Sequence, residues 1–307
     1  MTHSVDMKYE YYPETNIGGG PAGAAYACTV AGSADQLTPV SLPYNEDQTM
    51  PFIEYLQEAL EAPGQAISTK TTMTTGIKYL DGKLVQHMQN GTWLDWALGI
   101  APAEGGAGTV PKTFLLQWTN GLATYTSYGC YIKKYTLSGE PNKALKETIE
   151  FGHYKTEEEG PAFDAAWYDA STAVANFEDV GSTTITIEGN AITTLNSFEL
   201  RIENEYSEGP HAGSYYHKYP YLMKRNVEID MEFETDVYDE ALDAIFATEA
   251  AVTTLTIVFT PLGKANFQAD MMKVKNEATN FNIIPEKGIK KWKTTFEIGG
   301  VGAFTTP

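Results

Sequence analysis

The chain has 307 residues and a mass of 33.7 kDa, and 42% of its residues are hydrophobic, which excludes a disordered chain. Its 40 acidic and 21 basic residues give a formal net charge of −19 with only two arginines, which disfavours nucleic-acid and anionic-membrane binders, since both need basic surfaces. The sequence has no apolar run long enough to predict a transmembrane helix. Its first residues are polar, so we expect no secretory signal. We expect Cys28 and Cys130 to be free thiols.

The first half of the chain predicts strands that follow an irregular arm. Residues 1–50 are rich in Gly, Pro, Ala, Ser and Thr, and Phe52–Leu60 has apolar residues at helical spacing, which predicts a short helix. Residues 157–182 predict an acidic connection in which Glu157, Glu158 and Glu159 are solvated. The remaining predicted elements are strands at Thr71–Leu80 (ending at an Asp81-Gly82 turn), Thr113–Trp118, Gly129–Leu137 and Leu145–Tyr154, and a short apolar helix at Thr92–Leu98.

The second half contains the clearest strand pattern. Ser197–Glu203 and Val227–Glu234 alternate fully between apolar and charged residues. Because successive side chains of a strand point to opposite faces, each segment predicts a half-buried strand with one charged face. We further expect strands at Thr184–Glu188, Thr253–Phe259, Asn266–Lys275 and Ile289–Ile298, and a helix at Tyr238–Ala247 after the N-cap candidate Asp236.

These elements predict a mainly β protein with four segments. They are an N-terminal arm with a short helix (1–64), a first β half (65–160), an acidic connection (161–182) and a second β half (183–307). Each half reads as strands, a short helix and further strands, and short echoes join them, such as Glu147–Phe151 beside Glu228–Phe233. The echoes share no single register, so the sequence leaves open whether the halves are a duplication.

One motif is typical of an enzyme. The segment Gly18–Gly23 satisfies the G-x-G-x-x-G pattern of dinucleotide-binding turns, which require a buried strand directly before the glycines. The preceding segment, Lys8–Asn16, is polar and contains Pro13, so a Gly-rich arm is the favoured interpretation. An oxidoreductase that uses FAD or NAD through this turn remains the alternative.

The rest of the sequence offers no catalytic, cofactor-binding or metal-binding residues, and we expect a protein without enzymatic activity. The spacing of His211 and His217 is not that of a metal-binding pair, and neither cysteine lies in a nucleophile signature. The two alternating strands instead predict a face of carboxylates that has only Arg201 among them. A negative wall repels phosphates, so it lets DNA pass without binding it. The residues of this predicted lumen-facing acidic face are Glu199, Glu203, Glu228, Asp230, Glu232 and Glu234.

Leu195–Glu205, a loop, Arg225–Phe233 and the helix at 238–247 together resemble the tail tube proteins of long-tailed phages and archaeal tailed viruses. Gly129–Leu137 followed by Leu145–Phe151 is similar to an earlier strand pair of that family. The resemblance extends over about residues 65–300. It implies a β-sandwich or partial barrel with short flanking helices. Such subunits form rings of six, or of three if the chain carries two tube-like halves, and the rings stack into a hollow tube that conducts DNA.

The resemblance also implies a virion protein of the tail, assembled in the host cytoplasm, without cofactors or membrane contacts. Its implied partners are further copies of itself and the tape measure, terminator and baseplate proteins. Another tail, baseplate or injection-system component of the same fold is a second alternative. The host, the ring stoichiometry and a contractile or non-contractile tail stay open.

Two contact regions follow from the resemblance by position. The long loop Ser207–Leu222 is the expected ring-stacking or inter-subunit loop, and a lysine-rich segment is expected to contact the acidic region of a neighbour. The loop residues are His211, Tyr215, Tyr216, His217, Tyr219 and Tyr221, and the basic residues are Lys264, Lys273, Lys275, Lys287, Lys290, Lys291 and Lys293.

Overall fold

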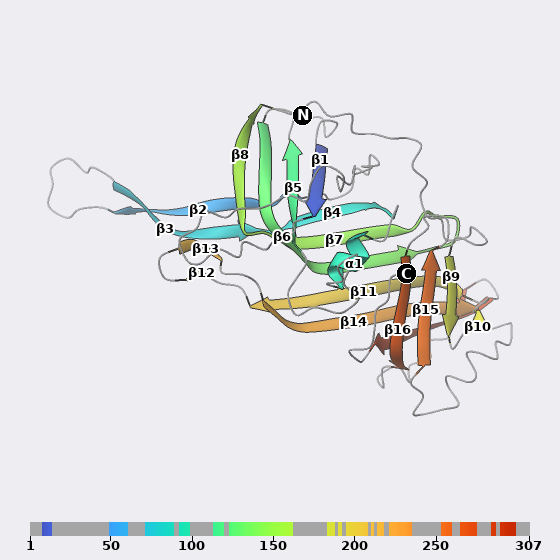
Figure 1. Cartoon of the computed structure of the whole chain (residues 1–307). Coiled ribbons are helices and arrows are strands. Elements are labelled where there is room, and N and C mark those ends of the chain that lie inside the picture. Colours follow the sequence, from blue (N-terminus) through green and yellow to red (C-terminus); the bar gives the residue numbers. More distant parts are fainter. Residues whose placement is uncertain are drawn as a thin grey trace.

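The structure is a computed structural model, and its described part is almost entirely β (Figure 1). It describes residues 8–13, 49–60, 71–88, 92–98, 113–119, 123–161, 183–187, 190–191, 195–207, 210–211, 214–217, 221–234, 253–259, 265–274, 284–286 and 289–298. Within these ranges no helix has the length and apolar character needed to cross a membrane. The predicted mainly β fold is confirmed.

One 14-stranded antiparallel sheet contains most of the strands. Its main path runs in the order β1 (Lys8–Pro13), β5 (Thr113–Thr119), β6 (Ala123–Gly139), β11 (Leu195–Ser207), β14 (Tyr221–Glu234), β18 (Ile289–Ile298), β16 (Ala265–Val274), β15 (Thr253–Phe259), β9 (Thr183–Ile187) and β10 (Asn190–Ala191). Off this path, β7 (Lys146–Gly152) pairs with β4 (Gly82–His87) and β6, β8 (Lys155–Pro161) pairs with β6, and β17 (Ile284–Glu286) pairs with β18. The β6–β11 pair therefore joins the two predicted halves into one sheet.

The long strand β6 changes direction in its middle. Its first part pairs with β5 and β8, and its last part pairs with β7 and β11. In Figure 1 the strands around the first part cross the direction of those around the last part. Gly129 lies at this bend with φ 59°, a left-handed conformation that favours glycine. Opposite Tyr131, Gly152 leaves room for the tyrosine ring, since a Cβ there would lie 2.7 Å from Cζ of that ring.

The hydrophobic core lies on one face of the central strands and is covered by the helix α1 (Thr92–Ala97). Trp93 and Trp96 of α1 pack on Phe114 of β5 with ring centroids 5.2 and 5.1 Å away, and Phe114 contacts Phe151 of β7 at 5.5 Å. An isolated helix of six residues is unstable in water, so this aromatic packing holds α1 in place. The sheet supplies the alternating apolar residues, among them Ile149, Phe198, Leu200, Ile202, Val227, Ile229 and Met231.

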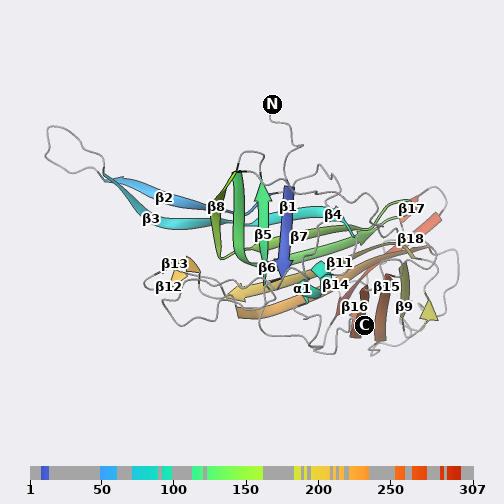
Figure 2. The same cartoon turned by 45° about the horizontal axis from the view of Figure 1, so that its top comes forward.

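Two sequence predictions in the first half were wrong. Phe52–Leu60 is not a helix but strand β2, which pairs with β3 (Thr71–Leu80) along its whole length. The Thr-rich β3 provides a ladder of backbone hydrogen bonds, and this tertiary partner overrides the helical spacing. The β2–β3 hairpin extends away from the main sheet (Figures 1 and 2). Asp81-Gly82 is also no hairpin turn, because β3 pairs with β2 whereas β4 pairs with β7.

Two segments that were predicted to be irregular each contain a strand. The start of the predicted acidic connection is strand β8, in which Glu157 and Glu158 are exposed to solvent as expected. Part of the predicted irregular arm is strand β1, which pairs with β5. The helix predicted at 238–247, the glycine motif at 18–23 and residues 162–182 lie outside the described residues. The remaining predicted strands and the helix at 92–98 are present.

Candidate functional site

The alternation of β11 and β14 gives the central sheet one charged face. The two strands are antiparallel, with Glu199 directly opposite Asp230 and Arg201 directly opposite Glu228. Directly opposite residues share a face, so these side chains gather on one side of the sheet. The neighbouring pair Leu200 and Ile229 points to the other side and is fully buried in the core. We call this surface of β6, β11 and β14 the charged face.

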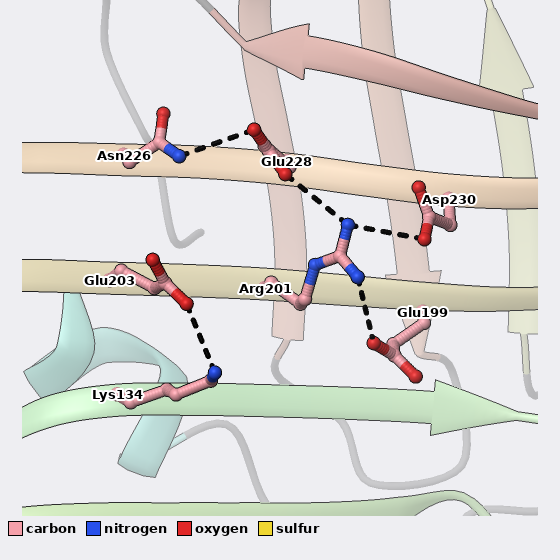
Figure 3. A network of polar contacts seen from close by, with 7 residues as sticks. All are labelled: Lys134, Glu199, Arg201, Glu203, Asn226, Glu228 and Asp230. Carbon is pink, nitrogen blue, oxygen red and sulfur yellow. Dashed lines mark hydrogen bonds and ion pairs between the residues drawn. The ribbon is translucent and has the colours of Figure 1, made fainter.

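Arg201 is the centre of the charged face (Figure 3). One of its terminal guanidinium nitrogens lies 3.3 Å from Oε1 of Glu199, and the other lies 3.2 Å from Oε2 of Glu228 and 3.1 Å from Oδ2 of Asp230. Carboxylates placed directly opposite each other destabilise a sheet. A planar guanidinium can bind several carboxylate oxygens at once, so Arg201 offsets the repulsion among its three acidic neighbours.

Three further side chains bind carboxylates of the charged face. Lys134 of β6 forms an ion pair with Glu203, with Nζ 3.0 Å from Oε1. Asn196 donates to Glu232 at 2.7 Å, and Asn226 donates to Glu228 at 3.3 Å. Of the predicted acidic residues, the side chain of Glu234 is not described. The five described carboxylates and the two cations Arg201 and Lys134 give the charged face a formal charge of −3.

A shallow pocket of about 180 Å³ opens beside this network. It lies where β6 ends and where β11 and β14 run side by side. Its lining consists of Ser138, Gly139, Glu140, Ser197, Phe198, Glu199, Asp230, Met231 and Glu232. Among the residues that the structure describes, no group of His, Cys, Asp and Glu side chains is arranged to hold a metal ion.

Part of the predicted basic segment lies beside the acidic strand of the same chain. In the β14–β18 pair, Glu232 is opposite Lys293 and Glu234 is opposite Lys291. Lys273 of β16 is opposite Glu297 of β18, and Lys290 of β18 is opposite Pro285 of β17. The other three residues, Lys264, Lys275 and Lys287, lie outside the described ranges.

The predicted stacking loop contains a small ribbon. Pro210–His211 is strand β12, and it pairs with Ser214–His217, strand β13, which includes Tyr215 and Tyr216. This ribbon lies beside β3 at the end of the molecule from which the β2–β3 hairpin extends (Figures 1 and 2). Tyr221 is the first residue of β14, and Tyr219 is outside the described ranges.

Sequence reasoning missed a buried carboxyl group in the core. Glu147 of β7 is 1% exposed, and it accepts hydrogen bonds from Nε2 of Gln86 at 2.6 Å and from the hydroxyl of Tyr135 at 3.1 Å. Burial raises the pKa of Glu147 to about 8, although the two hydrogen bonds act in the opposite direction. Glu147 has the same strand parity as the buried residues Ile149 and Phe151, and this parity was the signal that could have revealed it.

A second buried network ties α1 to the sheet. Asn204 of β11 donates to the carbonyl oxygens of Ala97 (2.8 Å) and Ile132 (3.1 Å). Arg225 of β14 donates to the side-chain oxygen of Asn204 at 2.8 Å and to the carbonyl oxygen of Leu98 at 2.7 Å. These bonds satisfy carbonyl groups at the C-terminus of the helix, which lack partners within it. Burial lowers the pKa of Arg225.

The fold and this face define a class of protein: a structural β-sheet subunit with one apolar and one charged face on its central strands. A family model described as "Phage tail tube protein" matches residues 73–298. The match extends over most of the chain, so the chain belongs to the phage tail tube protein family. A search of curated proteins found no match. The resemblance seen in the sequence is therefore confirmed, and the protein is a structural component of the virion tail, where it assembles with itself and other tail proteins.

Proposed function

We propose that the chain closes into rings, that the rings stack into the hollow tail tube, and that viral DNA passes through this tube during ejection without specific binding. The observation that carries the proposal is the charged face, on which carboxylates converge around Arg201. We assign this face to the lumen. The opposite face of the same strands is the core beneath α1, so it is not available to line a channel.

The geometry of the charged face suits a wall that DNA slides along. Arginine is the side chain that most readily binds phosphate, and here Arg201 is surrounded by three carboxylates of its own chain. Lys134 is engaged by Glu203 in the same way. The residual negative charge repels phosphates within about one Debye length, roughly 8 Å at physiological ionic strength. The face therefore combines ordered side chains with net repulsion of DNA.

We further propose that contacts between stacked rings involve the β2–β3 hairpin together with the predicted loop Ser207–Leu222. Both lie at the same end of the molecule (Figures 1 and 2), and a hairpin that leaves its sheet needs a partner to be stable. The ends of the tube would meet the tape measure, terminator and baseplate proteins, and assembly would take place in the host cytoplasm.

Negative-stain electron microscopy of the purified chain, with light scattering on the same sample, tests the proposal. We expect rings or hollow tubes, and scattering that rises with concentration. A chain that stays monomeric alone, and also when seeded with short tube fragments from virions, would contradict ring assembly.

Reversing charge on the face, without touching the Arg201 cluster, tests its assignment to the lumen. We expect tubes of the double variant Glu203→Lys, Glu232→Lys to form normally but to retain a short fluorescent DNA duplex about tenfold more than native tubes at low salt, with retention lost at high salt. The matched control is Glu157→Lys, Glu158→Lys on β8, which makes the same charge change and also removes one lysine partner, that of Lys155. Equal retention by both variants would contradict the lumen assignment.

A further inference from the structure

The two halves of the sheet repeat one pairing scheme. In the first half the strands adjacent in the sheet are β4, β7, β6 and β5, in that order. In the second half they are β14, β18, β16 and β15, again in that order. The order of the four strands along the chain is also the same in both halves. Four strands, their three pairings and their order along the chain thus correspond.

The registers and the sequence agree with this correspondence. Fully buried Leu84 of β4 is opposite Ile149, and fully buried Ile229 of β14 is opposite Phe296. Aligning these pairs sets Lys146–Gly152 (KETIEFG) against residues 293–299 (KTTFEIG), which share Lys, Thr, Glu and Gly at equivalent positions. The same alignment matches the pair Lys134 and Glu150 with the pair Lys273 and Glu297.

The strand that pairs with the first member of each set from the N-terminal side corresponds as well. Thr49 pairs with Lys83 through two backbone hydrogen bonds of 2.9 and 2.7 Å, and Phe52 pairs with Leu80. Both pairs belong to one antiparallel register, because Phe52 lies three residues after Thr49 and its partner Leu80 lies three residues before Lys83. The segment from Thr49 to the end of β2 is therefore one strand that runs along β3 and β4, as β11 runs along β14.

Within the chain, the two halves are joined by one antiparallel pair, β6 with β11. Its register places Ile202 opposite Tyr135 and Glu203 opposite Lys134. In the correspondence above, β16 takes the place of β6, and the strand through Thr49 takes the place of β11. The equivalent pairs are then Met50 with Val274 and Pro51 with Lys273. In the described structure these two segments do not pair with each other within one chain.

We infer that the chain is an internal duplication of one tube unit, and that a second copy of the chain pairs its Thr49–Pro51 strand with β16 in the register of the β6–β11 junction. This inference rests on the proposed ring assembly and specifies its contact. Every ring then contains half as many chains as tube units. A ring of six units, as the resemblance implies, is closed by three chains.

The backbone at both edges fits this pairing. Along an antiparallel strand, residues point their N–H and C=O groups alternately to the two neighbouring strands. Both groups of Thr49 point to β4, so those of Met50 point to the opposite edge. Pro51, which has no N–H, occupies a position that does not donate to that edge. On β16, the pairing with β15 ends at Met272, and the proposed partner begins at Lys273. Similarly, β5 ends its pairing with β6 at Tyr131, and β11 follows from Lys134.

The test is an inter-chain disulfide in the double variant Pro51→Cys, Lys273→Cys. This pair is predicted to be of the non-hydrogen-bonded type, in which opposite side chains lie closest. Assembled rings of the variant are oxidised mildly and separated on a denaturing gel without reductant. We expect a ladder of one, two and three linked chains that stops at three and collapses on reduction. The two single variants and the native chain, which keeps Cys28 and Cys130, are the controls and should give no ladder.

Each outcome has a separate meaning. A ladder that continues to six would overturn closure by three duplicated chains. Rings without any cross-link would overturn the proposed register. Rings that never form, even from the native chain, would instead count against the proposed function itself. If the double variant fails to fold, native mass spectrometry of rings of the unmodified chain decides the stoichiometry, because three chains of 33.7 kDa total about 101 kDa and six total twice that mass.

Discussion

The variant Glu147→Gln is expected to be more stable than the native subunit at pH 8 by several kcal/mol. The folded-state pKa of Glu147 is about 8, against an ordinary value of 4.5, and each pKa unit corresponds to about 1.4 kcal/mol. The full effect is thus about 5 kcal/mol as an order of magnitude. The glutamine side chain of the variant keeps the shape of the protonated carboxyl group between Gln86 and Tyr135 but has no proton to lose.

The direction of the pH dependence follows from the raised pKa. The folded state holds the proton more tightly than the unfolded state does. The contribution of Glu147 is therefore fully present below pH 4.5, declines between pH 4.5 and about 8, and is lost above that range. In Glu147→Gln this decline is absent, so the difference between variant and native chain grows as the pH rises.

Urea unfolding of the dilute subunit at pH 5, 6, 7 and 8 measures this difference. The matched control is Glu150→Gln, which removes a carboxylate from the opposite face of the same strand, where the side chain is partly exposed. Parallel pH profiles for Glu147→Gln and the native chain would show that Glu147 is ionised in the folded protein.

The variant Arg225→Met is expected to lose about 3 kcal/mol of stability, because hydrogen bonds from a charged donor are worth about 1.5–3 kcal/mol each and their loss leaves buried acceptors unsatisfied. The two acceptors are the carbonyl oxygen of Leu98 and the side-chain oxygen of Asn204, a residue that is 6% exposed. We expect α1 to be the first element to loosen, which hydrogen exchange at Trp93–Ala97 would report.

Arg201→Met is the natural comparison, since Arg201 and Arg225 are the only arginines of the chain. The side chain of Arg201 is 29% exposed, and its partners range from Glu199 (43% exposed) to the largely buried Glu228 (16%) and Asp230 (10%), so water screens these ion pairs in part. We expect a loss of about 1 kcal/mol in thermal or urea unfolding. An equal loss in both variants would contradict the assignment of Arg225 as the anchor of the helix.

The predictions from sequence were most accurate for strands that alternate strictly between apolar and charged residues. Strict alternation identified β11 and β14 together with their charged face, because one face of each strand is buried and the other is not. Phe52–Leu60 was misread because its apolar residues satisfy a helical template, whereas its structure depends on β3, a partner that periodicity does not reveal. Strand β1, in a polar segment containing Pro13, likewise exists through its pairing with β5.

In the candidate site, too, the features set by one strand were predicted and those set by the pairing of distant strands were not. The alternation of each strand placed its acidic residues on one face, but the ion pair of Glu203 with Lys134 depends on the pairing of β6 with β11. The place of Arg201 among three carboxylates depends on the register of β11 with β14. Neither pairing can be predicted from a single segment, because the partners are strands that lie far apart in the chain.

The place of β6 between the two halves has a consequence for synthesis on the ribosome. Its partners β5, β7 and β8 lie within residues 113–161, but β11 begins only at Leu195. Translation proceeds at about 5–20 residues per second. The edge of β6 that pairs with β11 therefore stays unpaired for several seconds after β6 has been synthesised. On a crowded polysome, β11 of a neighbouring nascent chain competes for that edge. The tether from Pro161 to Leu195 gives the chain's own strand a high effective concentration, so its length sets how strongly the protein favours correct folding over strand exchange between copies.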